Sequence, residues 1–264
     1  MKHILVPIGS SENSSNTLQY AIDFASEINA KVFVFRAYNV QTKAGTIIDI
    51  TTIIERETNL YLRTIVKNVD RKNVTIKLIA AKGSVVDSIE TIDDEIGIDL
   101  IIVGPKSNSV KEEVFLGKTS GSIVKQTNVP VLVVPNGYSF QPFKSVLMAF
   151  KSAIIQQKNV LKPLQQLVEK FTTDVHLLLV KTPSSSEEDL VLDPILESLK
   201  TASETIESAT TYQAVLSKFE LYNPNLLCVF RRKRGFFKKL WEKNTVLKKE
   251  FDCSVPLLVL NGAK

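Results

Sequence analysis

Residues 98–135 constrain the fold more than any other part of the chain. They open with an apolar run, residues 100–103, that is typical of a parallel strand buried on both faces. Gly104 follows, where the backbone can turn sharply. After a loop we predict a helix start whose free N–H groups and hydroxyls could hold an anion such as a phosphate. The residues at this helix start are Gly117, Lys118, Thr119 and Ser120.

The first half of the chain alternates short apolar runs with segments of helical periodicity. We predict strands over residues 2–8, 31–37, 74–80, 100–103 and 129–134, and helices over about 18–28, 51–69 and 85–96. Strands that alternate with helices of this length are joined by right-handed crossovers into a parallel sheet. The predicted fold class is therefore α/β, with a doubly wound parallel sheet.

The second half repeats this order. The sequence VPLLVL at residues 255–260 copies VPVLVV at residues 129–134. Further strands are predicted over 145–150, 174–180, 212–215 and 225–230, with a helical face over 161–171 and a shorter acidic helix around 187–200. A repeat of this size indicates two fused domains of one fold. We predict a first domain over 1–137, a linker over 138–143, and a degenerate second domain over 144–264.

The spacing around Gly104 resembles the universal stress protein family. Its nucleotide-binding members show Gly, two residues, Gly, nine residues, then Gly with Ser or Thr, followed by a Val-Pro-Val-Leu-Val-Val-Pro strand. The resemblance implies two tandem domains of the Rossmann-like, adenine nucleotide alpha hydrolase-like fold in a cytoplasmic protein. It also implies that the domains pair through their last strands, which begin at Val129 and Val255, and it is compatible with a homodimer.

The same resemblance implies a site for ATP or ADP in the first domain. The adenine end would fall on Pro7, Ile8, Gly9 and Ala37, and the ribose and phosphates on Val103, Gly104, Lys106, Ser107, Gly117, Lys118, Thr119 and Ser120. Three positions depart from the family pattern. Gly9 stands where binding members place an Asp, Ser107 replaces the middle glycine, and Lys118 replaces the first hydroxyl. Lost or weakened nucleotide binding is the expectation.

Lys118 supports two interpretations. With Lys106 it could hold an anion as a point charge, or both lysines could be solvated. The second half has only two glycines, and the position of Gly104 is taken by Phe230 when the halves are aligned from their last strands. Nucleotide binding in the family manner is not expected there.

The positive charge of the chain is concentrated near its end. Residues 231–249 hold nine Lys or Arg and one acid, within a chain of net charge +5. Phe236, Phe237, Leu240 and Trp241 interleave with these charges. The segment fits an amphipathic helix on an anionic membrane surface or a contact with nucleic acid phosphates. The favoured interpretation is that the aromatics pack on the sheet and the charges point to water, so nucleic acid is not an expected partner.

Catalysis and metal binding find little support. The two histidines, His3 and His176, fall on predicted strands, and the two cysteines, Cys228 and Cys253, lie in or beside an apolar one. No spacing fits a metal site, and no apolar run is long enough to span a membrane. We expect a soluble, non-enzymatic stress-response or regulatory binding protein. The alternatives are an ATP/ADP-binding protein with at most slow hydrolysis, and an interaction protein that acts through residues 231–249.

Overall fold

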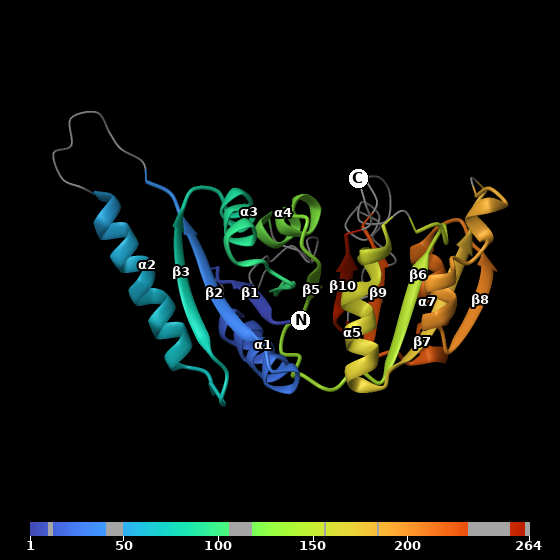
Figure 1. Cartoon of the computed structure of the whole chain (residues 1–264), viewed down its shortest axis with the longest axis horizontal. Helices are drawn as coiled ribbons and strands as arrows, with labels where there is room; N and C mark the ends of the chain where they lie inside the picture. Colours follow the sequence, from blue (N-terminus) through green and yellow to red (C-terminus); the bar gives the residue numbers. More distant parts are fainter. Residues whose placement is uncertain are drawn as a thin grey trace. The chain divides into compact units, whose positions relative to one another are not determined.

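The computed structural model describes residues 1–9, 13–40, 50–105, 118–155, 157–183, 185–231 and 254–261. The chain divides into two compact units; among the described residues, the first ends at Phe140 and the second begins at Gln141. Figure 1 shows the first unit in blue to green and the second in yellow to red. The division falls inside the segment 138–143.

The first unit is built on a parallel sheet. Its strands are β1 (His3–Pro7), β2 (Lys31–Tyr38), β3 (Ile76–Lys82), β4 (Leu100–Val103) and β5 (Val131–Val133), in the order β3-β2-β1-β4-β5. All of its described pairs are parallel. Every residue of the inner strand β4 is buried, as its continuous apolar sequence predicts.

Helices cover both faces of this sheet. They are α1 (Ser14–Ile28), α2 (Ile50–Lys67), α3 (Val85–Ile96) and α4 (Lys118–Gln126). Helix α1 contacts α2, and α3 contacts α4. Side chains at odd and even positions of β2 point to opposite faces of the sheet. Arg36 contacts Tyr61 of α2 on one face. Phe33 contacts His3 on the other face, and the His3 ring is hydrogen-bonded to the carbonyl of Ile96 at the carboxyl end of α3. The sheet is therefore doubly wound.

The second unit repeats the topology. Its strands are β6 (Ser145–Phe150), β7 (Asp174–Lys181), β8 (Ala202–Glu207), β9 (Leu226–Phe230) and β10 (Leu257–Leu260), in the parallel order β10-β9-β6-β7-β8. Its helices are α5 (Lys162–Phe171), α6 (Pro194–Leu199) and α7 (Thr211–Tyr222), with 3-10 turns η1 (Lys158–Leu161) and η2 (Glu188–Leu190). The strand order matches that of the first unit, so the internal repeat is a repeat of fold.

The structure corrects the prediction in two stretches of this unit. Residues 212–215 do not form a strand, because they lie inside α7, and the edge strand is β8 instead. The apolar run was too short to distinguish a strand from a buried helical turn. The acidic helix predicted over residues 187–200 is reduced to η2 and the six-residue α6, which begins at Pro194.

Aromatic residues around the division contact their own units. Tyr138 and Phe140 pack against Tyr20 of α1. Phe143 is 1% exposed and meets Phe171 of α5 edge-on. The pairing predicted between the strands that begin at Val129 and Val255 concerns how the units meet, and it stays a prediction. Within the described part of the chain, no helix is long and apolar enough to cross a membrane.

Candidate functional site

The carboxyl ends of β1 and β4 meet where the resemblance places a ligand. The two strands are parallel neighbours, with Ile4 opposite Leu100, so the residues that follow them reach the same edge of the sheet. Ile8 and Val103 are 4% and 2% exposed, and their side chains belong to the core. Gly9 is exposed at this edge. Because glycine has no side chain, the polar group that Gly9 places at this edge is its backbone carbonyl.

Gly104 is held against α1. A Cβ atom at this position would lie 2.4 Å from Oγ1 of Thr17, which is far closer than such atoms approach. Thr17 is 4% exposed and β-branched, so it has little freedom to move away. The packing of α1 on the end of β4 is therefore sufficient to explain the glycine.

The start of α4 is tied to the same turn. Oγ of Ser120 donates a hydrogen bond of 2.8 Å to the carbonyl oxygen of Gly104. Thr119 is exposed, and α4 begins at Lys118. The predicted phosphate contacts Lys106, Ser107 and Gly117 lie outside the described residues, as does the side chain of Lys118. Of the phosphate end, the structure thus brings together Val103, Gly104, Thr119 and Ser120.

The other end of the site contains three residues that the sequence did not single out. The carbonyl oxygen of Gly9 accepts hydrogen bonds from Tyr61 Oη at 2.9 Å, Arg36 Nη1 at 3.2 Å and Ser14 Oγ at 3.3 Å. The Arg36 guanidinium carbon lies 4.1 Å from the centre of the Tyr61 ring, in a cation–π contact. The one signal in the sequence was a charged residue inside an apolar strand. Ala37 comes next in β2 and is half-buried on the other face.

The corresponding edge of the second unit is apolar. Phe150 ends β6 and Phe230 ends β9, and their ring centres are 6.2 Å apart. Both are buried. The backbone N–H of Ala153 donates to the carbonyl of Asp189 at 2.8 Å, so the segment around η2 closes over the end of β6. In the described part of this edge, the buried Phe230 stands where the first unit has the Gly104 turn.

The histidines and the described cysteine have structural surroundings. Nδ1 of His3 lies 2.9 Å from the carbonyl oxygens of both Ile96 and Gly97, so this nitrogen must carry the proton. His176 stacks on Tyr222 with 4.7 Å between ring centres. Cys228 is fully buried, and burial raises the pKa of its thiol well above the ordinary value. The described residues contain no group of three or more side chains suited to a metal.

Fold and site together define a class: doubly wound α/β units that present a ligand edge at the carboxyl ends of their strands. Comparison with known proteins gives the family. Residues 1–135 match the model of the universal stress protein family. Because this match covers about half of the chain, the chain belongs to the universal stress protein family.

Individual relatives agree with this assignment. Universal stress protein MJ0531 of Methanocaldococcus jannaschii is 25% identical over 138 residues, which are 50% of this chain and 81% of that protein. Universal stress protein G of Escherichia coli O157:H7 is 30% identical over 81 residues, 31% of this chain and 56% of that protein. These matches span about half of the chain or less.

Solved structures match the fold of the whole chain. A universal stress protein from Archaeoglobus fulgidus has a TM-score of 0.72 at 20% identity, with 99% of this chain and 98% of that chain covered. A functionally unknown protein from Pseudomonas aeruginosa has a TM-score of 0.59 at 12% identity, with 99% and 93% covered. At these identities the likeness is one of fold.

Proposed function

We propose that the chain is a non-enzymatic, cytoplasmic stress-response or regulatory binding protein whose nucleotide binding is lost or weakened. The observation that carries the proposal is the hydrogen bond from Ser120 Oγ to the carbonyl of Gly104. A hydroxyl has one proton to donate, so in this arrangement Ser120 has none for a phosphate oxygen. The hydroxyl of Ser120 is thus used within the protein, on the carbonyl of the glycine turn.

The remaining anchor positions support the same proposal. Gly9 has no carboxylate to accept hydrogen bonds from a nucleoside, and its carbonyl already accepts three side-chain donors. Gly104 is required for the packing of α1, because a side chain at this position would overlap Thr17. A non-enzymatic role is supported by the histidine and cysteine environments, since the Nδ1 proton of His3 is committed to backbone carbonyls and the Cys228 thiol is buried.

An ATP/ADP-binding protein is the second candidate. The exposed hydroxyl of Thr119 in the first turn of α4 favours it, because a helix start attracts phosphate. Slow hydrolysis would require Lys118, Thr119 and Ser120 to hold the phosphates. The further alternative, a membrane or nucleic acid contact through residues 231–249, concerns a segment that lies outside the described residues apart from Arg231.

Thermal unfolding with and without millimolar ATP and magnesium tests the proposal. A ligand at ~100 times its dissociation constant adds about 2.7 kcal/mol of stability, which shifts the melting temperature by several degrees. We expect no shift that depends on nucleotide. A shift of several degrees that is reduced in Lys118→Ala would contradict the proposal and establish the second candidate. Salt-sensitive binding to anionic vesicles or nucleic acid would instead support the third.

A further inference from the structure

Three side-chain donors converge on one acceptor, the carbonyl oxygen of Gly9. Tyr61, Arg36 and Ser14 all lie within 3.3 Å of the Gly9 carbonyl oxygen. That oxygen has two lone pairs, so it cannot satisfy three donors with good geometry. Arg36 also has five N–H groups, of which the described contacts use one. The spot has more donors than acceptors.

The excess of donors carries a positive charge. The described ion pairs do not include Arg36, so no described carboxylate lies within 4.0 Å of its guanidinium. The nearby acid on α2, Glu55, accepts instead from the hydroxyl of Tyr38 at 3.5 Å. The ring of Tyr61 packs against the face of the guanidinium and fixes its orientation. Arg36 and Tyr61 are both partly exposed, so a ligand can reach them.

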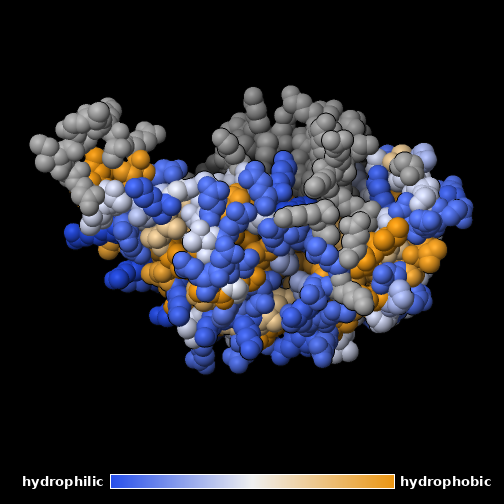
Figure 2. Space-filling view, turned by 45° about the horizontal axis from the view of Figure 1, so that its top comes forward, coloured by the Kyte–Doolittle hydropathy of each residue, from blue (hydrophilic) through white to orange (hydrophobic). Residues whose placement is uncertain are grey.

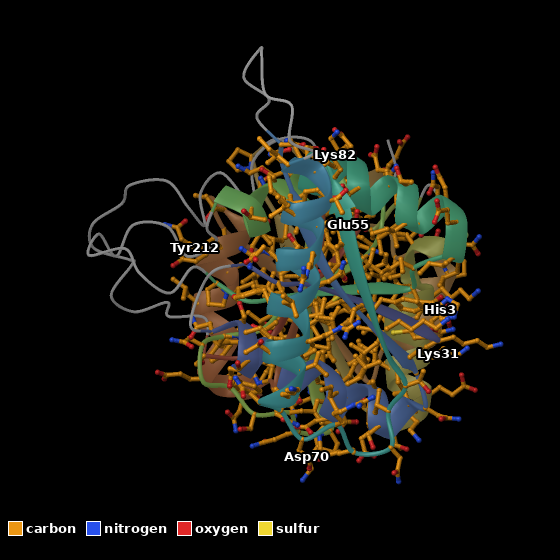
Figure 3. The ribbon with its side chains drawn as sticks, turned by 90° about the vertical axis from the view of Figure 1, so that its left-hand side faces the viewer. His3, Lys31, Glu55, Asp70, Lys82 and Tyr212 are labelled. Carbon is orange, nitrogen blue, oxygen red and sulfur yellow. The ribbon has the colours of Figure 1, made fainter. Side chains whose placement is uncertain are left out.

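The position of this spot is that of a ligand site in an open α/β sheet. Arg36 lies near the carboxyl end of β2, and Gly9 follows the carboxyl end of β1. Figure 3 looks at this side of the first unit: Glu55 and Lys82 mark the carboxyl end of the strands, and Lys31 lies toward the opposite end. The residues that the family resemblance assigns to nucleotide do not include Arg36, Tyr61 or Ser14.

We infer that the guanidinium of Arg36, with the hydroxyl of Tyr61 beside it, binds a small oxyanion, a carboxylate or a phosphate monoester group, next to Gly9. A planar guanidinium matches two oxygens of such a group, and the described contacts use one of its five N–H groups. The oxyanion takes the one hydrogen bond that the two lone pairs of the Gly9 carbonyl leave over. The inference rests on the proposed function and deepens it, because it names the class of ligand that replaces a nucleotide in this unit.

The test titrates inorganic phosphate and, separately, acetate into the full chain at constant ionic strength, with chloride as the balancing anion. Thermal unfolding and calorimetry are the readouts. The key variant is Arg36→Gln, whose amide N–H can still donate to the Gly9 carbonyl while the charge is gone. Lys31→Gln removes an equal charge at the other end of β2 and is the matched control. Tyr61→Phe keeps the ring and removes the hydroxyl.

We expect phosphate, acetate or both to raise the melting temperature of the wild type and of Lys31→Gln. In Arg36→Gln the affinity should fall about tenfold or more, since a charge-assisted bond is lost. The affinity of Tyr61→Phe should lie between those of the wild type and Arg36→Gln. The anion that acts identifies the ligand as phosphate or carboxylate.

Two results would overturn the inference: no saturable effect of either anion at millimolar concentration, or an equal effect in Arg36→Gln and the wild type. If Arg36→Gln proves too unstable to measure, Tyr61→Phe with unchanged affinity has the same meaning. These failures leave the proposed function standing. The proposed function fails separately, by stabilisation with ATP and magnesium that does not depend on Arg36.

Discussion

At the scale of single residues, Gly104 shows how one position can satisfy a sequence motif for a structural reason. Its missing Cβ admits Oγ1 of Thr17, and its carbonyl accepts the hydroxyl of Ser120. These contacts join α1, β4 and α4 at one point. A glycine at this position is therefore required whether or not a phosphate ever binds.

Gly104→Ala should destabilise the protein by about 1–3 kcal/mol, because the added methyl group overlaps the Thr17 side chain. Urea unfolding of Gly104→Ala, Thr17→Ala and the double variant measures the coupling. The double variant should cost less than the sum of the single ones, since removal of Oγ1 makes room for the methyl. Additive costs would show that the two residues do not press on each other.

Asp99 provides a pH-dependent contact at the opposite edge of the sheet. Its Oδ2 accepts the backbone N–H groups of Lys2 at 2.6 Å and His3 at 3.0 Å. Partial burial alone would raise the pKa of Asp99, but these hydrogen bonds lower it below the ordinary value on balance. The ionised form is thus the one that the folded state favours.

The contribution of Asp99 should therefore be present above its ordinary pKa and disappear as the pH falls through the lowered, folded-state pKa. Urea unfolding of the wild type and Asp99→Asn across this range provides the measurement. The wild type should be the more stable at neutral pH, and the difference should close in acid. A difference that stays constant with pH would contradict this role.

At the scale of elements, α7 and β8 could not be predicted correctly from the local sequence alone. Thr210 caps α7, because its Oγ1 accepts the backbone N–H of Gln213 at 3.2 Å. Tyr222 and Lys218 of α7 then bond to Glu204 of β8. Contacts between elements settle the assignment: the helix holds the edge strand, which is polar on its exposed positions and has little apolar signal of its own.

Thr210→Ala should cost about 1 kcal/mol of stability, since one N–H of the first turn of α7 loses its acceptor. Thr210→Ser keeps the hydroxyl and should remain close to the wild type. Chemical denaturation of the two variants compares the costs. Equal losses in both would mean that the methyl group of Thr210, rather than its cap, is what matters.

The strands that lie inside the sheets could be predicted from sequence, because their apolar runs have no competing interpretation. Gly104 and Ser120 could be placed at one edge for the same reason, since parallel strands bring their carboxyl ends together. Arg36 and Tyr61 could not. They belong to different elements, 25 positions apart in the chain, and only the packing of α2 on β2 brings them to the Gly9 carbonyl.

At the scale of the whole molecule, the two units share one topology and differ at the ligand edge. The first unit has a glycine turn and a half-exposed Arg36 there, whereas the second has Phe150 and Phe230. Figure 2 shows polar and apolar surface mixed over both units. One fold has been kept twice, and the described residues of the second copy have buried phenylalanines at this edge where the first copy has the Gly104 turn.

Isothermal titration of ATP with magnesium into the purified full chain measures whether the first unit binds nucleotide. Because the hydroxyl of Ser120 is bonded to the carbonyl of Gly104, we expect no saturable heat of binding up to millimolar nucleotide. Saturable binding with a stoichiometry near one per chain, weakened by Lys118→Ala, would contradict it. That result would mean that the first unit is a working nucleotide site in spite of the Ser120–Gly104 bond.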